Sequence, residues 1–147
     1  LRWIAQQNAV QGARVLDYGC GSGILAIAAA KFGAADIDAV DIDPAAVEST
    51  QWNAANNHAT LRSGLPDLVD PAQGAYGVVL ANILATPLKV LAPLLCAHVA
   101  RGGHLVLAGI LERQAEELQA AYAAHLPLRV ADTQEGWVLM TAQKPAH

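Results

Sequence analysis

The sequence predicts an α/β domain built on a Rossmann-like, mostly parallel sheet. Three observations support this fold class. Short apolar segments typical of buried strands alternate with Ala-rich segments typical of helices through most of the chain. A glycine-rich turn follows the first of these strands. The last portion carries two strand-like segments around Glu135-Gly136, which predicts an antiparallel hairpin at the end of the sheet.

The chain begins at Leu1 without a Met, inside what reads as the end of a helix at 1–7, so we interpret it as a fragment. The next elements follow from strand-like apolar runs and from helix signals, with Gly33 placed to end the first full helix and Asp43 to cap the second. They are a strand at 14–18, a helix at 24–32, a strand at 36–42 and a helix at 44–57.

The second half continues the alternation after a turn-rich stretch at 63–77, which we expect to be a loop with one short helix. Pro87 is expected near the start of the next helix, and Pro93 should kink it. The remaining elements are strands at 59–62, 78–81 and 103–108, helices at 86–100 and 112–124, and a hairpin formed by 128–133 and 137–142. This gives seven strands in a single domain covering 1–147.

Bulk composition sets limits on the function. The 147 residues are 54% hydrophobic and carry a net charge of −4, which supports a buried core and argues against direct nucleic-acid binding. No apolar run reaches the ~20 residues that span a bilayer, so no membrane partner is expected. Cys20 and Cys96 form no C-x-x-C pair and read as free thiols of a reducing, cytoplasmic compartment. The five histidines show no ligand spacing, and we expect no metal site.

The glycine-rich turn has the pattern D-x-G-x-G-x-G, with glycines at positions 19, 21 and 23. A dinucleotide-binding G-x-G-x-x-G would need its third glycine at Ile24. The observed spacing is typical of S-adenosylmethionine (SAM) methyltransferases. Backbone without Cβ atoms lets a ligand lie against the main chain, so Gly19, Cys20, Gly21 and Gly23 are candidate cofactor-binding residues.

Polar residues end three of the central strands: Asp17, Asp41 and Asn82. Ligands of open α/β sheets bind beyond the carboxyl ends of the strands. A carboxylate at Asp41 could accept hydrogen bonds from both ribose hydroxyls, whereas Asp43, just before Pro44, is adequately explained as a helix cap. Asp17 could either fix the glycine turn through backbone N–H groups or meet the ammonium of the cofactor.

The remaining candidates carry weaker signals. Ile42 adjoins Asp41 and is assigned to the cofactor site with it. Leu65 and Pro66 could cover one face of an adenine, or could simply belong to a turn. Asn82 could orient an accepting nitrogen through its side-chain carbonyl, in which case it is both catalytic and in contact with the cofactor; the alternative is that it binds local backbone.

The segments V-D-I-D-P (residues 40–44), A-N-I-L-A (residues 81–85) and G-I-L-E (residues 109–112) sharpen this interpretation. With the glycine motif and T-Q-E-G-W (residues 133–137), they resemble the catalytic domain of the bacterial ribosomal-protein methyltransferase family PrmA, within the class I SAM methyltransferases. The resemblance covers nearly the whole chain. It implies a seven-stranded class I fold and transfer of methyl groups from SAM to lysine and N-terminal amines of the eleventh large-subunit ribosomal protein. It also implies that a substrate-recognition domain precedes this one.

By the same resemblance, Gly19, Gly21 and Gly23 line the cofactor, Asp41 holds the ribose and Asn82 faces the acceptor amine. Three other functions stay open at this point. One is a SAM-dependent methyltransferase that acts on another protein or small-molecule amine. Another is a SAM-binding fragment without activity when truncated, and the last is a dinucleotide-dependent oxidoreductase. The oligomeric state is left open as well.

Overall fold

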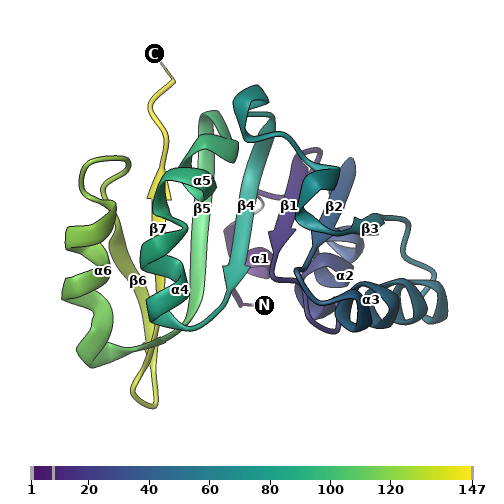
Figure 1. Cartoon of the computed structure of the whole chain (residues 1–147), viewed down its shortest axis with the longest axis horizontal. Coiled ribbons are helices and arrows are strands. Elements are labelled where there is room, and N and C mark those ends of the chain that lie inside the picture. The colour runs from purple at the N-terminus through teal and green to yellow at the C-terminus, as the bar shows by residue number, and fades with distance from the viewer. Residues whose placement is uncertain (1, 8, 147) are drawn as a thin grey trace.

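A computed structural model of the chain describes residues 2–7 and 9–146 (Figure 1). Its described part contains a seven-stranded sheet in the order β3-β2-β1-β4-β5-β7-β6. The first five strands pair in parallel, and β7 runs antiparallel to both β5 and β6. The strands are β1 (Arg14–Tyr18), β2 (Asp36–Val40), β3 (Arg62–Gly64), β4 (Tyr76–Asn82), β5 (Val99–Leu111), β6 (Arg129–Gln134) and β7 (Trp137–Gln143). The predicted class, a mostly parallel sheet with a terminal hairpin, is confirmed.

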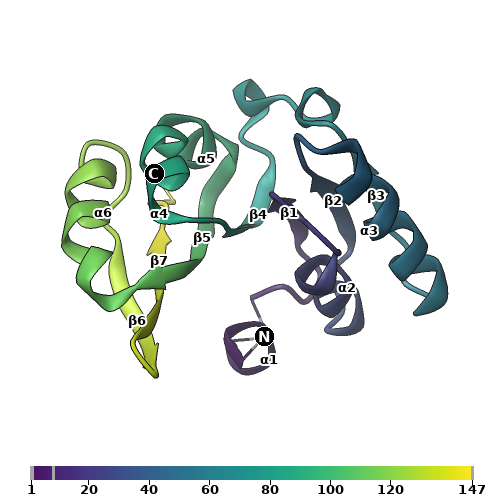
Figure 2. The same cartoon turned by 60° about the horizontal axis from the view of Figure 1, so that its bottom comes forward.

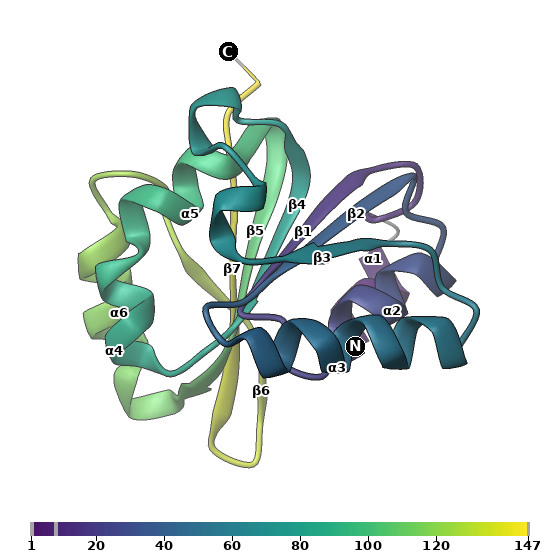
Figure 3. The ribbon, with the colours of Figure 1, turned by 45° about the vertical axis from the view of Figure 1, so that its right-hand side comes forward.

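Helices cover both faces of this sheet. Figure 3 shows α4, α5 and α6 on one side and α1, α2 and α3 on the other, and Figure 2 shows α1 and α2 together on that second side. The helices are α1 (Arg2–Gln7), α2 (Ile24–Lys31), α3 (Pro44–Asn56), α4 (Ala85–Val90), α5 (Ala92–His98) and α6 (Ala115–Tyr122). The predicted helix end at 1–7 corresponds to α1, while Leu1 lies outside the described residues.

Two apolar clusters fill the space between sheet and helices. On the α4–α6 side, Leu88, Leu95 and Leu118 pack with Leu105 and Leu107 of the sheet. On the other side, alanines of α2 pack with apolar residues of β1, β2 and β4. Strands buried on both faces read as continuous apolar runs, which is why β4 was recognisable in the sequence. The burial holds the carboxyl ends of β1 and β4 in fixed positions.

Two predicted elements differ from the structure in kind or place. The third strand was expected at 59–62 but is β3 at Arg62–Gly64, since Arg62 pairs with Asp38 of β2 and sets the register. The helix expected at 86–100 is two helices, α4 and α5, and its last two positions already belong to β5. Pro93 explains the division because it lacks an N–H group, and it lies in the first turn of α5, where none is needed.

Further boundaries also differ from the predicted ones. Strand β5 runs well beyond the predicted 103–108 because Val99 pairs with Tyr76 and Ile110 pairs with Val138 of β7. The loop at 63–77 holds two short 3-10 turns, Pro66–Leu68 and Pro71–Gln73, instead of one. The helix expected at 112–124 begins with the 3-10 turn Glu112–Gln114 before α6. The hairpin around Glu135-Gly136 is confirmed.

A buried carboxylate ties the edge of the sheet to its centre. Asp38 of β2 is 1% exposed and accepts hydrogen bonds from Arg62 Nε at 2.7 Å and Arg62 Nη2 at 2.8 Å. The Tyr76 hydroxyl of β4 donates to the same carboxylate. The guanidinium of Arg14 lies 5.1 Å from the centroid of the Tyr76 ring. Arg14 Nη2 of β1 also lies 3.9 Å from Asp38 Oδ2, so side chains of four strands meet at this carboxylate.

The Asp38→Asn variant is expected to lower the free energy of unfolding by about 1–3 kcal/mol, because an amide leaves one of these donors without an acceptor. Urea denaturation would measure the change. Asp36→Asn is the matched control on the same strand. The Asp36 carboxylate is 54% exposed and lies 3.4 Å from Arg14, so its loss should cost no more than ~1 kcal/mol. Equal effects of the two substitutions would contradict the structural role given to Asp38.

Candidate functional site

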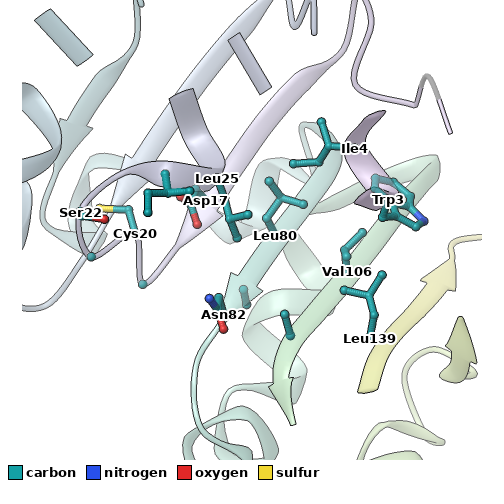
Figure 4. A pocket seen from close by; sticks show the side chains of 15 residues that line it. Trp3, Ile4, Asp17, Cys20, Ser22, Leu25, Leu80, Asn82, Val106 and Leu139 are labelled. Carbon is teal, nitrogen blue, oxygen red and sulfur yellow. The ribbon is translucent and has the colours of Figure 1, made fainter. Parts of the chain in front are cut away.

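A cavity of about 500 Å³ opens at the carboxyl ends of β1 and β4 (Figure 4). The neighbours of β1 here are β2 on one side and β4 on the other, so the strand order reverses at this point. Open α/β sheets bind ligands in the crevice at such a reversal. The lining residues come from α1, β1, the glycine turn, α2, β4, β5 and β7. Five of the predicted site residues lie among them: Asp17, Gly19, Cys20, Gly21 and Asn82.

The three glycines of the turn have different surroundings. All three have positive φ: 78° at Gly19, 56° at Gly21 and 87° at Gly23. A Cβ on Gly21 would meet nothing within 4 Å, so its backbone faces open space that a ligand could fill. A Cβ on Gly23 would lie 2.9 Å from Thr50 Cγ2, and Gly23 does not line the cavity. Gly23 therefore permits close packing of the turn against α3.

Helix α3 holds the glycine turn through two side chains that the sequence analysis did not identify. The hydroxyl of Thr50, which is fully buried, donates to the Gly21 carbonyl at 3.0 Å. Asn53 Nδ2 donates to the Ser22 carbonyl at 2.8 Å. Their spacing of three residues on a predicted helix was the available signal, since it places both on one face. Helix α3 thus fixes the glycine turn on one side, and the backbone of Gly21 stays accessible to a ligand on the other.

The carboxylate of Asp41 is held against the same turn. Its Oδ2 accepts from the Gly21 N–H at 3.0 Å, and its Oδ1 accepts from the Asp43 N–H at 3.0 Å. Each carboxylate oxygen keeps a further lone pair for a hydroxyl donor. Asp41 lies beside the cavity and does not line it. Asp43 accepts from the Ala45 N–H at 3.0 Å, which confirms its predicted role as the cap of α3.

Three predicted residues lie outside the cavity, along the ends of β2 and β3. The Asp41 N–H donates to the Gly64 carbonyl at 3.2 Å, which joins the ends of these strands. Ile42 next to Asp41 is 81% exposed, and Leu65 next to Gly64 is 44% exposed. Pro66 begins the following 3-10 turn. This edge offers apolar side chains for a flat ring, and the three assignments stay predictions.

Asp17 is the buried acidic group of the cavity. It is 1% exposed, its carboxylate accepts a hydrogen bond from the Ala26 backbone, and its Oδ2 has no partner. Burial raises the pKa of the Asp17 carboxyl to about 7, the Ala26 hydrogen bond opposes this rise, and the negative charge of Asp41 adds to it. A carboxyl group with such a pKa in a cleft is typical of a functional site.

Asn82 ends β4 and lies on the opposite side of the cavity opening from the glycine turn (Figure 4). Across from it, Gly109 of β5 has φ of 80°, and a Cβ there would lie 2.8 Å from Asn82 Oδ1 and 3.1 Å from the Ile83 carbonyl oxygen. A glycine at 109 therefore makes room for the Asn82 side chain. Gly109 belongs to the G-I-L-E segment, and no role for it was predicted from the sequence.

The far wall of the cavity is apolar and comes partly from α1. Trp3 and Ile4 face Val106 of β5 and Leu139 of β7 across it (Figure 4). The Trp3 ring also meets the His104 ring edge-on, with centroids 5.8 Å apart. The place of Trp3 in the cavity wall was not predicted, because α1 is far from β5 and β7 in sequence.

Two further features concern only the described part of the chain. Within it, no cluster of three or more His, Cys, Asp or Glu side chains could hold a metal ion. None of its helices combines the length and hydropathy needed to cross a membrane.

Comparison with known proteins shows which family this chain is similar to. Residues 1–145 match the family model described as ribosomal protein L11 methyltransferase (PrmA). A ribosomal protein L11 methyltransferase of Polaromonas sp. is 71% identical over 145 residues, which are 97% of this chain and 48% of the relative. That of Ralstonia pickettii is 51% identical, over 99% of this chain and 48% of the relative. The chain thus spans about half the length of the curated relatives it matches.

Solved structures show the same fold. The ribosomal protein L11 methylase of Lactobacillus delbrueckii subsp. bulgaricus superposes with a TM-score of 0.83 at 29% identity, covering 98% of this chain and 78% of that one. An RNA methyltransferase of Salinibacter ruber, in complex with S-adenosyl-L-homocysteine, gives a TM-score of 0.76 at 20% identity, covering 99% of this chain and 90% of that one. This second likeness supports the fold alone.

Proposed function

This chain belongs to the ribosomal protein L11 methyltransferase (PrmA) family, and from that membership we propose that it is the SAM-dependent catalytic domain of a protein N-methyltransferase. Its substrate would be ribosomal protein L11, modified at lysine side chains and at the N-terminal amine. The observation that carries the proposal is the cavity between β1 and β4, where the open backbone of Gly21 and the side chain of Asn82 lie at one opening.

The residues present fit SAM. Gly21 offers backbone that a ligand can approach, and Asp17 offers a buried oxygen without a partner. We assign the ribose hydroxyls to Asp41, since its carboxylate is already oriented by two backbone N–H groups. Backbone of Gly19, Cys20 and Gly21 would line the methionine part, with Gly23 holding the turn against α3. Ile42, Leu65 and Pro66 would cover the adenine.

When bound, SAM supplies the activated methyl group, so the protein has mainly to position the acceptor. Positioning can contribute roughly 7–11 kcal/mol in favourable cases. Asn82 would accept a hydrogen bond from the amine through its side-chain carbonyl and aim the nitrogen lone pair into the site. Gly109 would act as a positioning residue, because it leaves the space in which the Asn82 side chain lies.

The acceptor amine must be neutral to react. For a free lysine with pKa near 10.4, deprotonation at pH 7 costs on the order of 4–5 kcal/mol. The described side chains that line the cavity include no histidine or lysine to act as a base. We therefore assign the proton to water, with Asn82 orienting the amine and not deprotonating it.

We place substrate recognition outside these 147 residues, in an N-terminal domain of the full-length protein, because the chain spans about half the length of its curated relatives. The net charge of −4 suits a basic protein partner better than direct contact with nucleic acid. A ribosomal-protein substrate would place the activity in the cytoplasm.

Transfer of tritiated methyl groups from SAM to purified ribosomal protein L11 tests the proposal in the full-length protein. Label should appear on lysine and N-terminal residues of L11, and acetylation of those amines beforehand should abolish it. Labelling of other ribosomal proteins in place of L11 would contradict the proposed substrate.

The Gly109→Ala variant is expected to lower kcat about tenfold or more, because a Cβ 2.8 Å from Asn82 Oδ1 must displace the side chain that positions the amine. Gly102→Ala is the matched control: it lies on the same strand with φ of 78°, and its Cβ would meet nothing within 4 Å. Both variants should lose thermal stability from backbone strain, Gly109→Ala more because of its additional close contacts, but only Gly109→Ala should lose turnover. Equal turnover in the two variants would contradict the positioning role of Gly109.

A further inference from the structure

The turn after β1 contains three glycines, at positions 19, 21 and 23, and such a turn is flexible unless other groups restrain it. Glycine adopts positive and negative φ about equally readily, so many conformations of this turn have similar free energy. The structure selects one of them, in which all three glycines have φ between 56° and 87°. The partners of the backbone polar groups show which contacts select it.

The N–H groups of the turn are bound from the end of β2. The Val40 carbonyl accepts from the Gly19 N–H at 2.8 Å and from the Cys20 N–H at 3.0 Å. The Asp41 carboxylate accepts from the Gly21 N–H at 3.0 Å. Because Asp41 is also the proposed ribose ligand, its removal would change the turn and a cofactor contact together.

Two carbonyl groups of the turn are bound by α3. The Thr50 hydroxyl donates to the Gly21 carbonyl at 3.0 Å and also lies 3.2 Å from Cys20 Sγ. Asn53 Nδ2 donates to the Ser22 carbonyl at 2.8 Å. Neither Thr50 nor Asn53 is among the described residues that line the cavity. These two side chains therefore act on the cavity through the turn alone.

The Thr50 hydroxyl is a fixed donor. The side chain is fully buried, and it fills the space beside Gly23, where a Cβ would lie 2.9 Å from Thr50 Cγ2. A β-branched side chain has few rotamers, and close packing restricts them further. The contact with the Gly21 carbonyl is thus present in the structure without any ligand.

We propose that Thr50 and Asn53 are positioning residues of the cofactor site, which hold the glycine turn in its binding conformation in the free protein and thereby set the affinity for SAM. The inference rests on the proposed function, since it takes SAM as the ligand. When a ligand binds only one conformation, its apparent Kd is the intrinsic Kd divided by the fraction of protein in that conformation. Release of either carbonyl lowers this fraction and raises the Kd.

The Thr50→Val variant tests the role of the hydroxyl, because valine keeps the branched shape of threonine. Loss of one such hydrogen bond corresponds to a change of about three- to tenfold in an equilibrium constant. Titration calorimetry of the full-length protein should show the Kd for SAM raised by this factor in Thr50→Val and in Asn53→Ala. Thr50→Ser keeps the hydroxyl and should bind SAM more tightly than Thr50→Val.

Thr141→Val is the matched control for Thr50→Val. Thr141 is 4% exposed and lies on β7, which is not a neighbour of β1 in the sheet. Its substitution removes the hydroxyl of a buried threonine at a distance from the turn. Whatever the change in thermal stability, the Kd for SAM in Thr141→Val should stay within about twofold of that of the unaltered protein.

Turnover of the full-length protein distinguishes positioning of the turn from a general loss of structure. At saturating SAM the turn is in its bound conformation in every molecule, so Thr50→Val and Asn53→Ala should raise the KM for SAM and keep kcat within about twofold. A lower kcat with an unchanged KM for SAM would overturn the inference.

A measurement on the unaltered protein needs no substitution. Nitrogen-15 relaxation of the Gly21 and Ser22 amides, with relaxation dispersion for slower motion, should give order parameters of about 0.85 and no exchange, both without and with SAM. Amides that are mobile in the free protein, with order parameters below about 0.6 or with exchange, and that become rigid on binding would overturn the inference, since the ligand would then order the turn.

Failure of this inference is distinct from failure of the proposed function. An unchanged Kd for SAM in both Thr50→Val and Asn53→Ala would overturn the positioning roles and leave SAM as the cofactor. Absence of SAM binding by the unaltered full-length protein would overturn the proposed function and this inference with it.

Discussion

Replacing Asp41 by Ala is expected to weaken SAM binding by roughly two to four orders of magnitude. Charge-assisted hydrogen bonds contribute about 1.5–3 kcal/mol each, and the carboxylate is proposed to make one with each ribose hydroxyl. The substitution also removes the acceptor of the Gly21 N–H, so the glycine turn loses a bond that orients it. Titration calorimetry with SAM would measure the loss.

Asp43→Ala is the matched control for Asp41→Ala. Asp43 lies two residues further on and caps α3 through the Ala45 N–H, so its removal should lower stability by ~1 kcal/mol. The Kd for SAM should change less than threefold in this variant. Binding by Asp41→Ala within threefold of the unaltered chain would contradict the assignment of the ribose to Asp41.

Replacing Asn82 by Ala is expected to lower kcat in the full-length protein by roughly 10²- to 10³-fold. The loss should fall on kcat more than on the Kd for SAM, since the proposed contact orients the acceptor amine. Single-turnover methylation of L11 at saturating SAM would measure it. Asn82→Asp keeps a side-chain carbonyl oxygen and should retain more activity than Asn82→Ala.

Asn57→Ala, an exposed asparagine that follows α3, controls for loss of an amide elsewhere in the domain. It should leave turnover unchanged. An unchanged kcat in Asn82→Ala would contradict its catalytic role. A loss in SAM affinity alone would place Asn82 with the cofactor and not with the acceptor.

The central elements of the fold could be predicted because each carries its own local signal. Strand β1 carries the apolar residues Val15 and Leu16 and leads into the glycine turn, and α3 begins with Asp43 and Pro44 in the order that helix starts favour. The position of β3 could not be predicted in this way. It depends on the pairing of Arg62 with Asp38, a contact between residues 24 positions apart.

The same distinction applies to the site. Asp17 and Asn82 were found because they lie at strand ends, and Gly21 because it belongs to the glycine motif; the structure brings all three to one cavity. Thr50 and Gly109 were missed because their importance comes from contacts across the fold, with the Gly21 carbonyl and with the Asn82 side chain. For Thr50 the available signal was its spacing from Asn53 on a predicted helix, and for Gly109 the contact depends on how β5 pairs with β4.

Calorimetric titration of the chain with SAM, alongside NAD, tests the central claim most directly. The account predicts a single SAM site and no heat of binding with NAD, because the glycine turn is spaced for a ligand without a pyrophosphate. Binding of NAD with no binding of SAM would contradict it and would assign the cavity to a dinucleotide.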